Sequence, residues 1–360
     1  MNILVLPGDG IGPEITAATM QVVERANHAF GLGLAFSRAE IGLATLKTMG
    51  TTLPEGVMAA ARAADGIIIG PISHNDYPPR AQGGINVSGE LRVKLDLFAN
   101  IRPNRARPGV ASKSRTPIDL VIVRENTEGF YADRNMFAGT GEFMPTEDIA
   151  LAVRKITSAA SNRIARTAFE IARERRRKVT AVHKANVLRL SDGLFLREVR
   201  KVAAEFPEVA LEEVIVDAMA ALLVRDAQRF DVVVATNMYG DILSDEAGEL
   251  SGSLGLAGSL NAGGAHAFAQ AQHGSAPDLA GRNSANPTAL ILSAAMLLGW
   301  LGRRHREARF SRAAAAIESA IDATLAVPEL HTADLGGSAG TDAFAAAVSE
   351  KLGVLASAQL

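Results

Sequence analysis

Short apolar runs recur along the chain and alternate with longer segments of helical periodicity. Each run is rich in Val, Ile and Leu and ends at glycine or at polar residues. The clearest runs are ILVLP (3–7), GIIIG (66–70), DLVIV (119–123), VTAVH (179–183) and DVVVAT (231–236). Near-continuous apolar strands between helices indicate an α/β protein whose sheet is covered on both faces.

The helical segments include one long candidate and one strongly apolar candidate. Residues 146–177 are expected to form a helix, and their RERRRK tail (173–178) to complement its dipole in water rather than bind an anion. The apolar positions at helical spacing are Ile149, Val153, Ile156, Ala160, Ile164, Ala168 and Ile171. ALILSAAMLLGWLG (289–302) is shorter than a bilayer span and predicts a buried helix. Residues 70–90, rich in proline and glycine, are expected to be a functional loop.

Length and composition limit the classes of protein. A chain of 360 residues with 48% hydrophobic composition predicts two domains or two lobes. Lysine plus arginine (37) nearly balances aspartate plus glutamate (39), so no basic field favours nucleic acid or a membrane surface. The absence of cysteine excludes disulfides, thiolate zinc sites and a cysteine nucleophile. The start MNILVLPGDGIG lacks the features of a secretory signal, so we expect a cytoplasmic protein.

A glycine-rich turn follows the first apolar run. LPGDGIGPEI (6–15) reads as a strand, a turn and a helix with Pro13 near its first turn. The dinucleotide pattern G-x-G-x-x-G fails here, and Asp9 would repel a pyrophosphate. The turn is therefore either structural or a ligand loop.

Three arginines and a tyrosine lie in or after apolar segments. Arg92 and Arg102 belong to LRVKLDLFANIRP (91–103), whereas Arg124 and Tyr131 belong to RENTEGFYADR (124–134). Guanidinium groups bind carboxylates bidentately, so a convergence of these arginines would suit a di- or tricarboxylate. Scattered surface charges are the alternative. Arg124 ends a strand that should cross the core, which favours a role in a site.

Four further ionisable residues follow apolar runs. Lys184 and Asp217 lie where an ionisable group is costly unless it is paired or functional, although a salt bridge would explain either one. Asp241 and Asp245 of NMYGDILSDE (237–246) share one face if this segment is helical. Their oxygens suit Mg²⁺ or Mn²⁺, whereas helix capping and solvation are the ordinary alternatives.

Together these segments resemble one family. LPGDGIGPE, LDLFANIRP, RENTEGFY, VHKAN, NMYGDILSDEA, HGSAPDLAG and LGGSAGTDAF occur in this order between residues 1 and 347. The chain thereby resembles the metal-dependent β-decarboxylating dehydrogenases, the isocitrate and 3-isopropylmalate dehydrogenase family. The resemblance implies a two-domain, non-Rossmann α/β fold with its active site in the interdomain cleft. Residues 1–98 plus 252–360 would be the cofactor-binding domain, and 99–251 the substrate, metal and dimerisation domain.

The resemblance also implies roles for individual residues in a homodimer with shared active sites. Arg92, Arg102 and Arg124 would hold the malate carboxylates, while Asp241 and Asp245, with Asp217 of the partner subunit, would bind Mg²⁺ or Mn²⁺. Lys184 of the partner subunit would take the C2 hydroxyl proton as hydride leaves for the nicotinamide. The β-carboxylate would leave as CO₂, and Tyr131 would protonate the enolate.

The cofactor implied by the resemblance is NAD. A carboxylate at Asp278 accepts hydrogen bonds from ribose hydroxyls and repels a 2′-phosphate, and NADP-using relatives typically carry lysine and tyrosine where this chain has Asp278 and Leu279. The implied cofactor-binding residues are Ile11, His273, Gly274, Ser275, Ala276, Pro277, Asp278 and Asn286.

The substrate is less well indicated than the reaction. The pocket for the C3 substituent would include Asn86, Ser88 and Gly89, where isopropylmalate enzymes typically present leucines. HGSAPDLAG and LGGSAGTDAF nevertheless resemble the isopropylmalate branch, so 3-isopropylmalate is the leading substrate. Isocitrate, tartrate or another polar 3-substituted malate is the alternative. Rival functions are a non-catalytic regulatory subunit of an isocitrate dehydrogenase, a phosphohydroxythreonine-type dehydrogenase with a histidine-rich metal site, and a carboxylate-binding protein without turnover.

Overall fold

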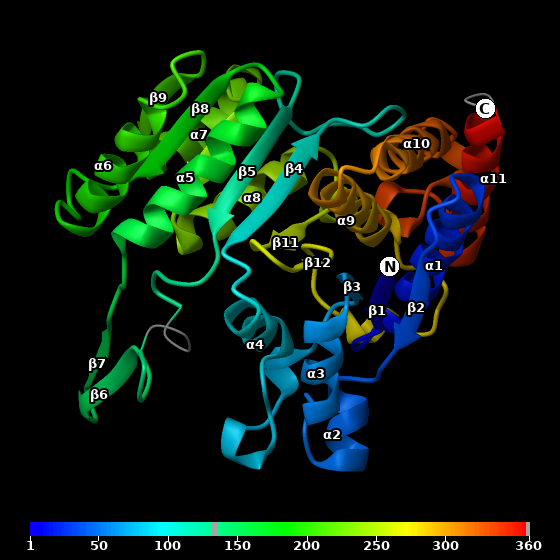
Figure 1. Cartoon of the computed structure of the whole chain (residues 1–360), viewed down its shortest axis with the longest axis horizontal. Coiled ribbons are helices and arrows are strands. Elements are labelled where there is room, and N and C mark those ends of the chain that lie inside the picture. Colours follow the sequence, from blue (N-terminus) through cyan, green and yellow to red (C-terminus); the bar gives the residue numbers. More distant parts are fainter. Residues whose placement is uncertain (132–135, 358–360) are drawn as a thin grey trace. The chain divides into compact units, whose positions relative to one another are not determined.

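The computed structural model describes residues 1–131 and 136–357, which form two compact units. Unit 1 comprises residues 1–91, residues 107–111 and the chain from Gly252 onward. Unit 2 comprises residues 92–106 and 112–251. Each unit combines a sheet with helices, as Figure 1 shows, so the α/β class expected from the alternating pattern is confirmed.

The sheet of unit 1 has the strand order β2-β1-β3-β12-β11. Its strands are β1 (Asn2–Leu6), β2 (Ala35–Arg38), β3 (Gly66–Ile69), β11 (Leu260–Ala262) and β12 (Ala267–Ala269). Neighbouring strands are parallel except for β11, which pairs antiparallel with β12. The apolar runs at 3–7 and 66–70 therefore form neighbouring buried strands, as the sequence predicts.

The helices of unit 1 pack around a core that includes the apolar segment near the C-terminal end. They are α1 (Gly12–Ala29), α2 (Leu43–Met49), α3 (Glu55–Ala63), α9 (Thr288–His305), α10 (Ala308–Leu325) and α11 (Thr341–Ser357). The predicted buried helix is confirmed, because α9 packs against α10, α1 and β12 and most of its residues are inaccessible to solvent. Within the described residues, no helix combines the length and apolar character needed to cross a membrane.

The sheet of unit 2 has the order β4-β5-β10-β8-β9, and helices pack on both of its faces. Its strands are β4 (Ala99–Arg105), β5 (Asp119–Glu125), β8 (Lys178–His183), β9 (Ala210–Ile215) and β10 (Val232–Ala235); its helices are α5 (Ser158–Arg173), α6 (Ser191–Ala203), α7 (Val216–Asp226) and α8 (Asn237–Leu250). Only β4 runs antiparallel to its neighbour. Along β5, Val121 and Val123 face α5 and α6, whereas Leu120 and Ile122 face α7 and α8.

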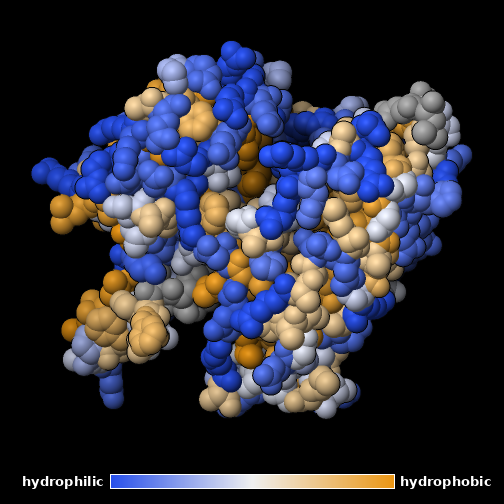
Figure 2. All heavy atoms as spheres, viewed as in Figure 1, coloured by the Kyte–Doolittle hydropathy of each residue, from blue (hydrophilic) through white to orange (hydrophobic). Residues whose placement is uncertain are grey.

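The expectation of one helix over 146–177 is wrong for its first third. Strands β6 (Glu142–Thr146) and β7 (Ile149–Ala152) form an antiparallel two-stranded arm, and α5 begins only at Ser158. The hydroxyl of Thr157 caps that helix by accepting a hydrogen bond from the Ala160 N–H at 3.2 Å. Ile149 is exposed on the arm, so the helical spacing there did not correspond to a buried face. Figure 2 shows the hydrophobic side chains that gather on this arm.

The loop at 70–90 contains little regular structure before helix α4 (Val87–Lys94). Two short 3-10 turns, His74–Asp76 and Arg80–Gln82, interrupt it. Asn86 precedes α4, and its side-chain oxygen accepts a hydrogen bond from the N–H of Gly89 at 3.0 Å. Asn86 thus has the position and the bond of a helix N-cap.

Candidate active site

Helix α8 carries the two aspartates that the sequence singled out. The buried strand β10 ends at Ala235, Thr236 is the N-cap residue, and α8 begins at Asn237. Asp241 and Asp245 lie one turn apart on this helix, with side chains 33% and 52% exposed. They therefore share a face and stay partly open to a ligand, as their spacing predicts.

Two buried arginines on the neighbouring strands β4 and β5 reach these aspartates. Arg124 donates to Asp241 and, at 2.8 Å, to the side-chain oxygen of Asn237. Arg102 approaches both aspartates at 3.2 Å. Gly240 allows this proximity, because a Cβ atom there would lie only 2.7 Å from Cβ of Arg124. The structure therefore brings four of the expected site residues together.

Tyr131 belongs to the same cluster. Its hydroxyl donates to Asp241, and the guanidinium of Arg124 lies 5.1 Å from the centre of its ring. Burial raises the pKa of Tyr131, and the charge of Asp241 adds to this, although Arg124 and Arg92 act in the opposite direction. The hydroxyl is therefore protonated at neutral pH and is available as a proton donor.

The two aspartates differ in their electrostatic setting. Burial alone would raise the pKa of Asp241, but Arg124 and Arg102 outweigh burial and hold that pKa below its ordinary value. Burial raises the pKa of Asp245, and the neighbouring charge of Asp241 reinforces the shift against Arg102. Carboxylate oxygens at this spacing could hold a hard divalent cation such as Mg²⁺.

Lys184 and Asp217 form a separate pair in unit 2. Lys184 follows β8, Asp217 lies in the first turn of α7, and the ammonium group donates to the carboxylate. This hydrogen bond lowers the pKa of Asp217. Among residues 1–131 and 136–357, no three His, Cys, Asp or Glu side chains gather as a metal site, so Asp217 does not join Asp241 and Asp245 within one chain.

The expected cofactor segment, residues 273–278, contacts the glycine-rich turn before α1. The N–H of Ile11 donates to the carbonyl oxygen of Ser275 at 2.8 Å. Gly10 makes this approach possible, since a Cβ atom there would lie 2.0 Å from that oxygen. Burial lowers the pKa of His273, whose Nδ1 lies 3.0 Å from the carbonyl oxygen of Gly274.

The remaining members of the expected cofactor set lie in or near the same part of unit 1. Asp278 is exposed in a 3-10 turn (Pro277–Leu279), and Ala276 precedes this turn with a positive φ of 37°. Asn286 is buried and donates to Asp334 at 3.1 Å. Among the expected cofactor-binding residues, Asp278 therefore presents a carboxylate to solvent.

Sequence reasoning missed the network that anchors this cofactor segment. Asp9 is buried and accepts hydrogen bonds from the N–H of Leu43 (2.7 Å), the N–H of Ser73 (3.0 Å) and the hydroxyl of Tyr77 (2.5 Å). The hydroxyls of Ser73 and Ser275 lie 2.7 Å apart. Asp9 therefore connects the start of α2 to the loop after β3 by hydrogen bonds, and its carboxylate does not face a ligand. An acidic residue inside a glycine-rich turn was the available signal, but its partners lie far away in sequence.

Ser88 is buried at the start of α4. Its hydroxyl donates to the side-chain oxygen of Gln270 at 3.1 Å, and the amide nitrogen of Gln270 donates to the carbonyl oxygen of Gly70 at 3.2 Å. The side chain of Gln270 therefore links Ser88 by hydrogen bonds to the loop after β3.

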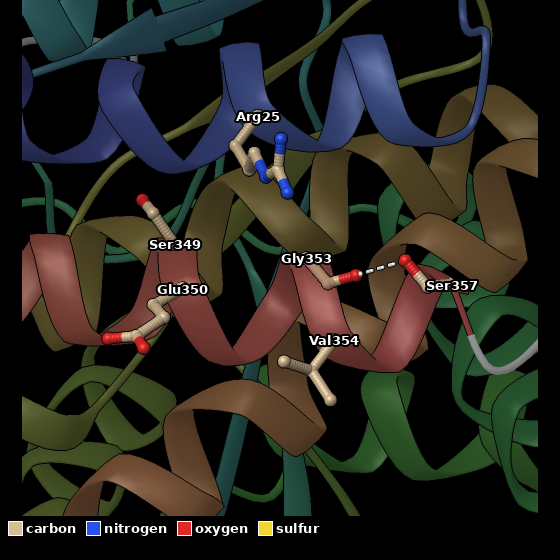
Figure 3. Close-up of a pocket in the computed structure, with 6 residues that line it drawn as sticks. All are labelled: Arg25, Ser349, Glu350, Gly353, Val354 and Ser357. Carbon is tan, nitrogen blue, oxygen red and sulfur yellow. Dashed lines mark hydrogen bonds between the residues drawn. The ribbon is translucent and has the colours of Figure 1, made fainter.

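A surface hollow of about 620 Å³ lies between α1 and α11 (Figure 3). It is lined by Arg25, Ser349, Glu350, Gly353, Val354 and Ser357. None of these residues belongs to the clusters described above, so the hollow is separate from the candidate active site.

Comparison with known proteins agrees with the resemblance in the sequence. The profile of the family described as isocitrate/isopropylmalate dehydrogenase matches residues 2–350. An isocitrate/homoisocitrate dehydrogenase of Thermus thermophilus is 44% identical over 353 residues, which cover 98% of each chain. A 3-isopropylmalate dehydrogenase of Saccharolobus solfataricus is 40% identical over 338 residues, covering 94% of this chain and 95% of its own.

A solved structure is similar as well. The isocitrate dehydrogenase of Methylococcus capsulatus superimposes with a TM-score of 0.86 at 38% sequence identity. The match covers 98% of this chain and 99% of that protein. The expected fold is therefore confirmed over nearly the whole chain.

Proposed function

The chain belongs to the isocitrate/isopropylmalate dehydrogenase family, and we propose that it catalyses the NAD-dependent, Mg²⁺- or Mn²⁺-dependent oxidative decarboxylation of a 3-substituted (R)-malate. 3-Isopropylmalate is the leading substrate, and isocitrate, tartrate or another polar malate is the alternative. Unit 1 would bind the cofactor, and unit 2 would carry the substrate, the metal and the dimer interface.

The observation that carries the proposal is the pair of buried arginines, Arg102 and Arg124, beside the carboxylates of α8. A buried guanidinium is costly unless an anion compensates its charge, and its planar fork favours carboxylates. These arginines already engage carboxylate groups of the chain itself. A substituted malate offers groups of the same charge and geometry, and Arg92 adds a third cation whose charge acts on Asp241 and Tyr131.

Asp241 and Asp245, with Asp217 of the partner subunit, are the residues that would hold the divalent metal. Their donor set is entirely carboxylate oxygen, which suits Mg²⁺ or Mn²⁺. The bound ion would supply Lewis-acid polarisation of the oxygen at C2. The low pKa of Asp241 keeps this ligand ionised, because Arg124 and Arg102 stabilise its charge.

Proton transfers would fall to two side chains of the protein. Lys184 of the partner subunit would accept the C2 hydroxyl proton. Tyr131 would protonate the carbon from which CO₂ leaves, because its raised pKa keeps the phenol protonated until a stronger base forms beside it. NAD⁺, held by the expected cofactor-binding residues of unit 1, would supply the hydride acceptor.

A homodimer with shared sites is supported by exposed apolar groups in unit 2. Val187 and Leu190 lie in the turn between β8 and α6, residues 184–190, which we call the Lys184 turn, and they are 66% and 90% exposed. The β6–β7 arm carries further apolar side chains. Exposed apolar clusters of this kind are typical of protein interfaces. A second copy that covered this surface would bring Lys184 and Asp217 toward another chain.

Two features bear on cofactor and substrate choice. Asp278 is exposed, and its carboxylate favours a ribose with free hydroxyls over a 2′-phosphate. Asn86 and Ser88 make the expected substituent pocket more polar than the leucines typical of isopropylmalate enzymes. Polar malates therefore remain the specific alternative to 3-isopropylmalate.

The test is a spectrophotometric panel. Purified protein with NAD⁺ and Mg²⁺ or Mn²⁺ is expected to form NADH with at least one 3-substituted malate. No NADH with any member would refute an enzyme and favour a regulatory subunit or a binding protein.

A complementation assay tests the shared site. Lys184→Ala and Asp241→Ala homodimers are each expected to be nearly inactive, whereas mixed and re-equilibrated samples should regain activity through one intact site per heterodimer. Confirmed subunit exchange without recovery would place each active site within one chain.

A further inference from the structure

Arg154 is a buried cation outside the proposed ligand-binding residues. It lies between the end of β7 and the start of α5, and its side chain is only 7% exposed. Burying a guanidinium requires compensation by anions and hydrogen-bond acceptors. The groups that compensate the charge of Arg154 therefore indicate which segments it holds in place.

One partner is the segment that carries Lys184. Arg154 pairs with Asp192, which is fully buried in the first turn of α6, and donates to the hydroxyl of Ser191 at 3.0 Å. The other carboxylate oxygen of Asp192 accepts the backbone N–H of Lys184 at 2.5 Å. Arg154 thus fixes the carboxylate that in turn fixes the backbone of Lys184.

The second set of partners lies beside α8 and Tyr131. The other terminal nitrogen of Arg154 donates to the hydroxyl of Thr236 at 3.0 Å, and Thr236 is the N-cap residue of α8. The guanidinium also lies 5.3 Å from the ring centre of Tyr239 and 5.6 Å from that of Phe130, which precedes Tyr131. The planar guanidinium of Arg154 therefore contacts both the segment that fixes Lys184 and the segments that carry α8 and Tyr131.

We propose that Arg154 is a positioning residue that couples the Lys184 turn to the start of α8 and to the Tyr131 segment. The proposal rests on the function proposed above. In the shared-site arrangement, Lys184 serves the site of the partner subunit, whereas Tyr131 and α8 serve the site of their own subunit. Arg154 then links the two active sites of the dimer through a single side chain.

Arg154→Lys is the informative substitution, because only arginine presents several N–H donors in a fixed planar arrangement. Lysine keeps the positive charge beside Asp192, but its single ammonium group replaces a fork that spans Asp192 and Thr236. The expected result is a kcat about 10- to 100-fold lower, since small misplacements of catalytic groups cost rate in this range. KM for NAD⁺ should remain within about 3-fold, because Arg154 touches none of the expected cofactor residues.

A lower kcat could also reflect less folded enzyme, so a second readout is needed. With malate deuterated at C2, the kinetic isotope effect on kcat should rise in Arg154→Lys, because misplaced groups make the chemical step more rate-limiting. Loss of folded enzyme alone would leave the isotope effect unchanged. Wild-type kcat together with a wild-type isotope effect would overturn the proposal.

The matched control is Arg163→Lys. Arg163 also lies over an aromatic ring, that of Phe98 at 4.4 Å, and donates to Asp96 at 2.9 Å and to the hydroxyl of Thr127 at 3.2 Å. Because it does not hold the Lys184 turn or α8, its substitution should leave kcat within about 2-fold of wild type. An equal loss of kcat in both variants would indicate general damage and overturn a specific role of Arg154.

A heterodimer with one active site shows in which chain Arg154→Lys lowers the rate. When one chain carries Lys184→Ala and the other Asp241→Ala, the single intact site uses Asp241 of the first chain and Lys184 of the second. Arg154→Lys is expected to lower the rate when placed in either chain. An effect from only one placement would overturn the coupling. A parent heterodimer that stays inactive after confirmed exchange would instead refute the shared site, and the homodimer assay would still decide whether Arg154 positions catalytic groups.

Discussion

Replacing Tyr77 with phenylalanine removes one hydrogen bond from the Asp9 network and leaves the ring in place. Asp9 then keeps the N–H donors of Leu43 and Ser73, at 2.7 and 3.0 Å, and loses the hydroxyl at 2.5 Å. A hydrogen bond to a buried charged group contributes about 1.5–3 kcal/mol. With a denaturant slope of about 3 kcal/mol/M, the urea midpoint should fall by about 0.5–1 M.

The same change should weaken cofactor binding selectively. Ser73 donates to Asp9 and contacts Ser275, so loosening Asp9 frees the segment expected to bind NAD. KM for NAD⁺ should rise about 3- to 10-fold while KM for the malate stays within about 2-fold, if less than half of the lost free energy reaches the cofactor segment. Tyr239→Phe, which removes a tyrosine hydroxyl from unit 2, is the control and should leave KM for NAD⁺ unchanged.

The stability difference should hold across neutral pH. Burial, followed by the hydrogen bond and charge of Asp9, raises the pKa of Tyr77 above its unfolded value of about 10. A raised folded pKa means that the contribution is fully present below the unfolded pKa and is lost only as the pH rises through the folded pKa. Equal urea midpoints and equal KM for NAD⁺ in wild type and Tyr77→Phe between pH 6 and 9 would refute the reasoning.

Three further predictions address metal, cofactor and substrate. Chelation of divalent ions should abolish NADH formation, and Mg²⁺ or Mn²⁺ should restore it; undiminished turnover would leave Asp241 and Asp245 with a structural role only. Wild type should prefer NAD⁺ over NADP⁺ by at least ~10-fold, and Asp278→Lys should narrow this ratio in kcat/KM, because it removes about 1.4 kcal/mol or more of repulsion; an unchanged ratio would show that Asp278 does not meet the ribose. Ser88→Leu should raise kcat/KM for isopropylmalate relative to polar malates through added apolar contact, whereas an equal loss on every malate would mean that Ser88 does not contact the substituent.

Local patterns predicted the elements and part of the site. The apolar runs became the buried strands β1, β3, β5, β8 and β10, because strands covered on both faces need continuous apolar side chains. Asp241 and Asp245 share a face of α8 because helical spacing alone places them one turn apart. Arg124 at the end of a core strand was expected in a site and is buried beside Asp241.

The same kind of pattern failed at residues 149–153, where apolar spacing predicted a helix and an exposed two-stranded arm formed. Periodicity reports which side chains could share a face, but not whether anything covers that face. A surface arm can carry apolar groups without a core beneath them, and the hydroxyl cap of Thr157 sets where the helix begins.

What the sequence by itself determined is the α/β class, the order of the elements and the chemistry available at their ends, because these depend on neighbouring residues. Only the tertiary structure decided that Asp9 binds Tyr77 rather than facing a ligand, and that Arg154 spans Asp192 and Thr236. These partners lie dozens of residues apart along the chain. Their contacts arise from the packing of strands and helices, and a buried charge takes whichever partner that packing brings within reach.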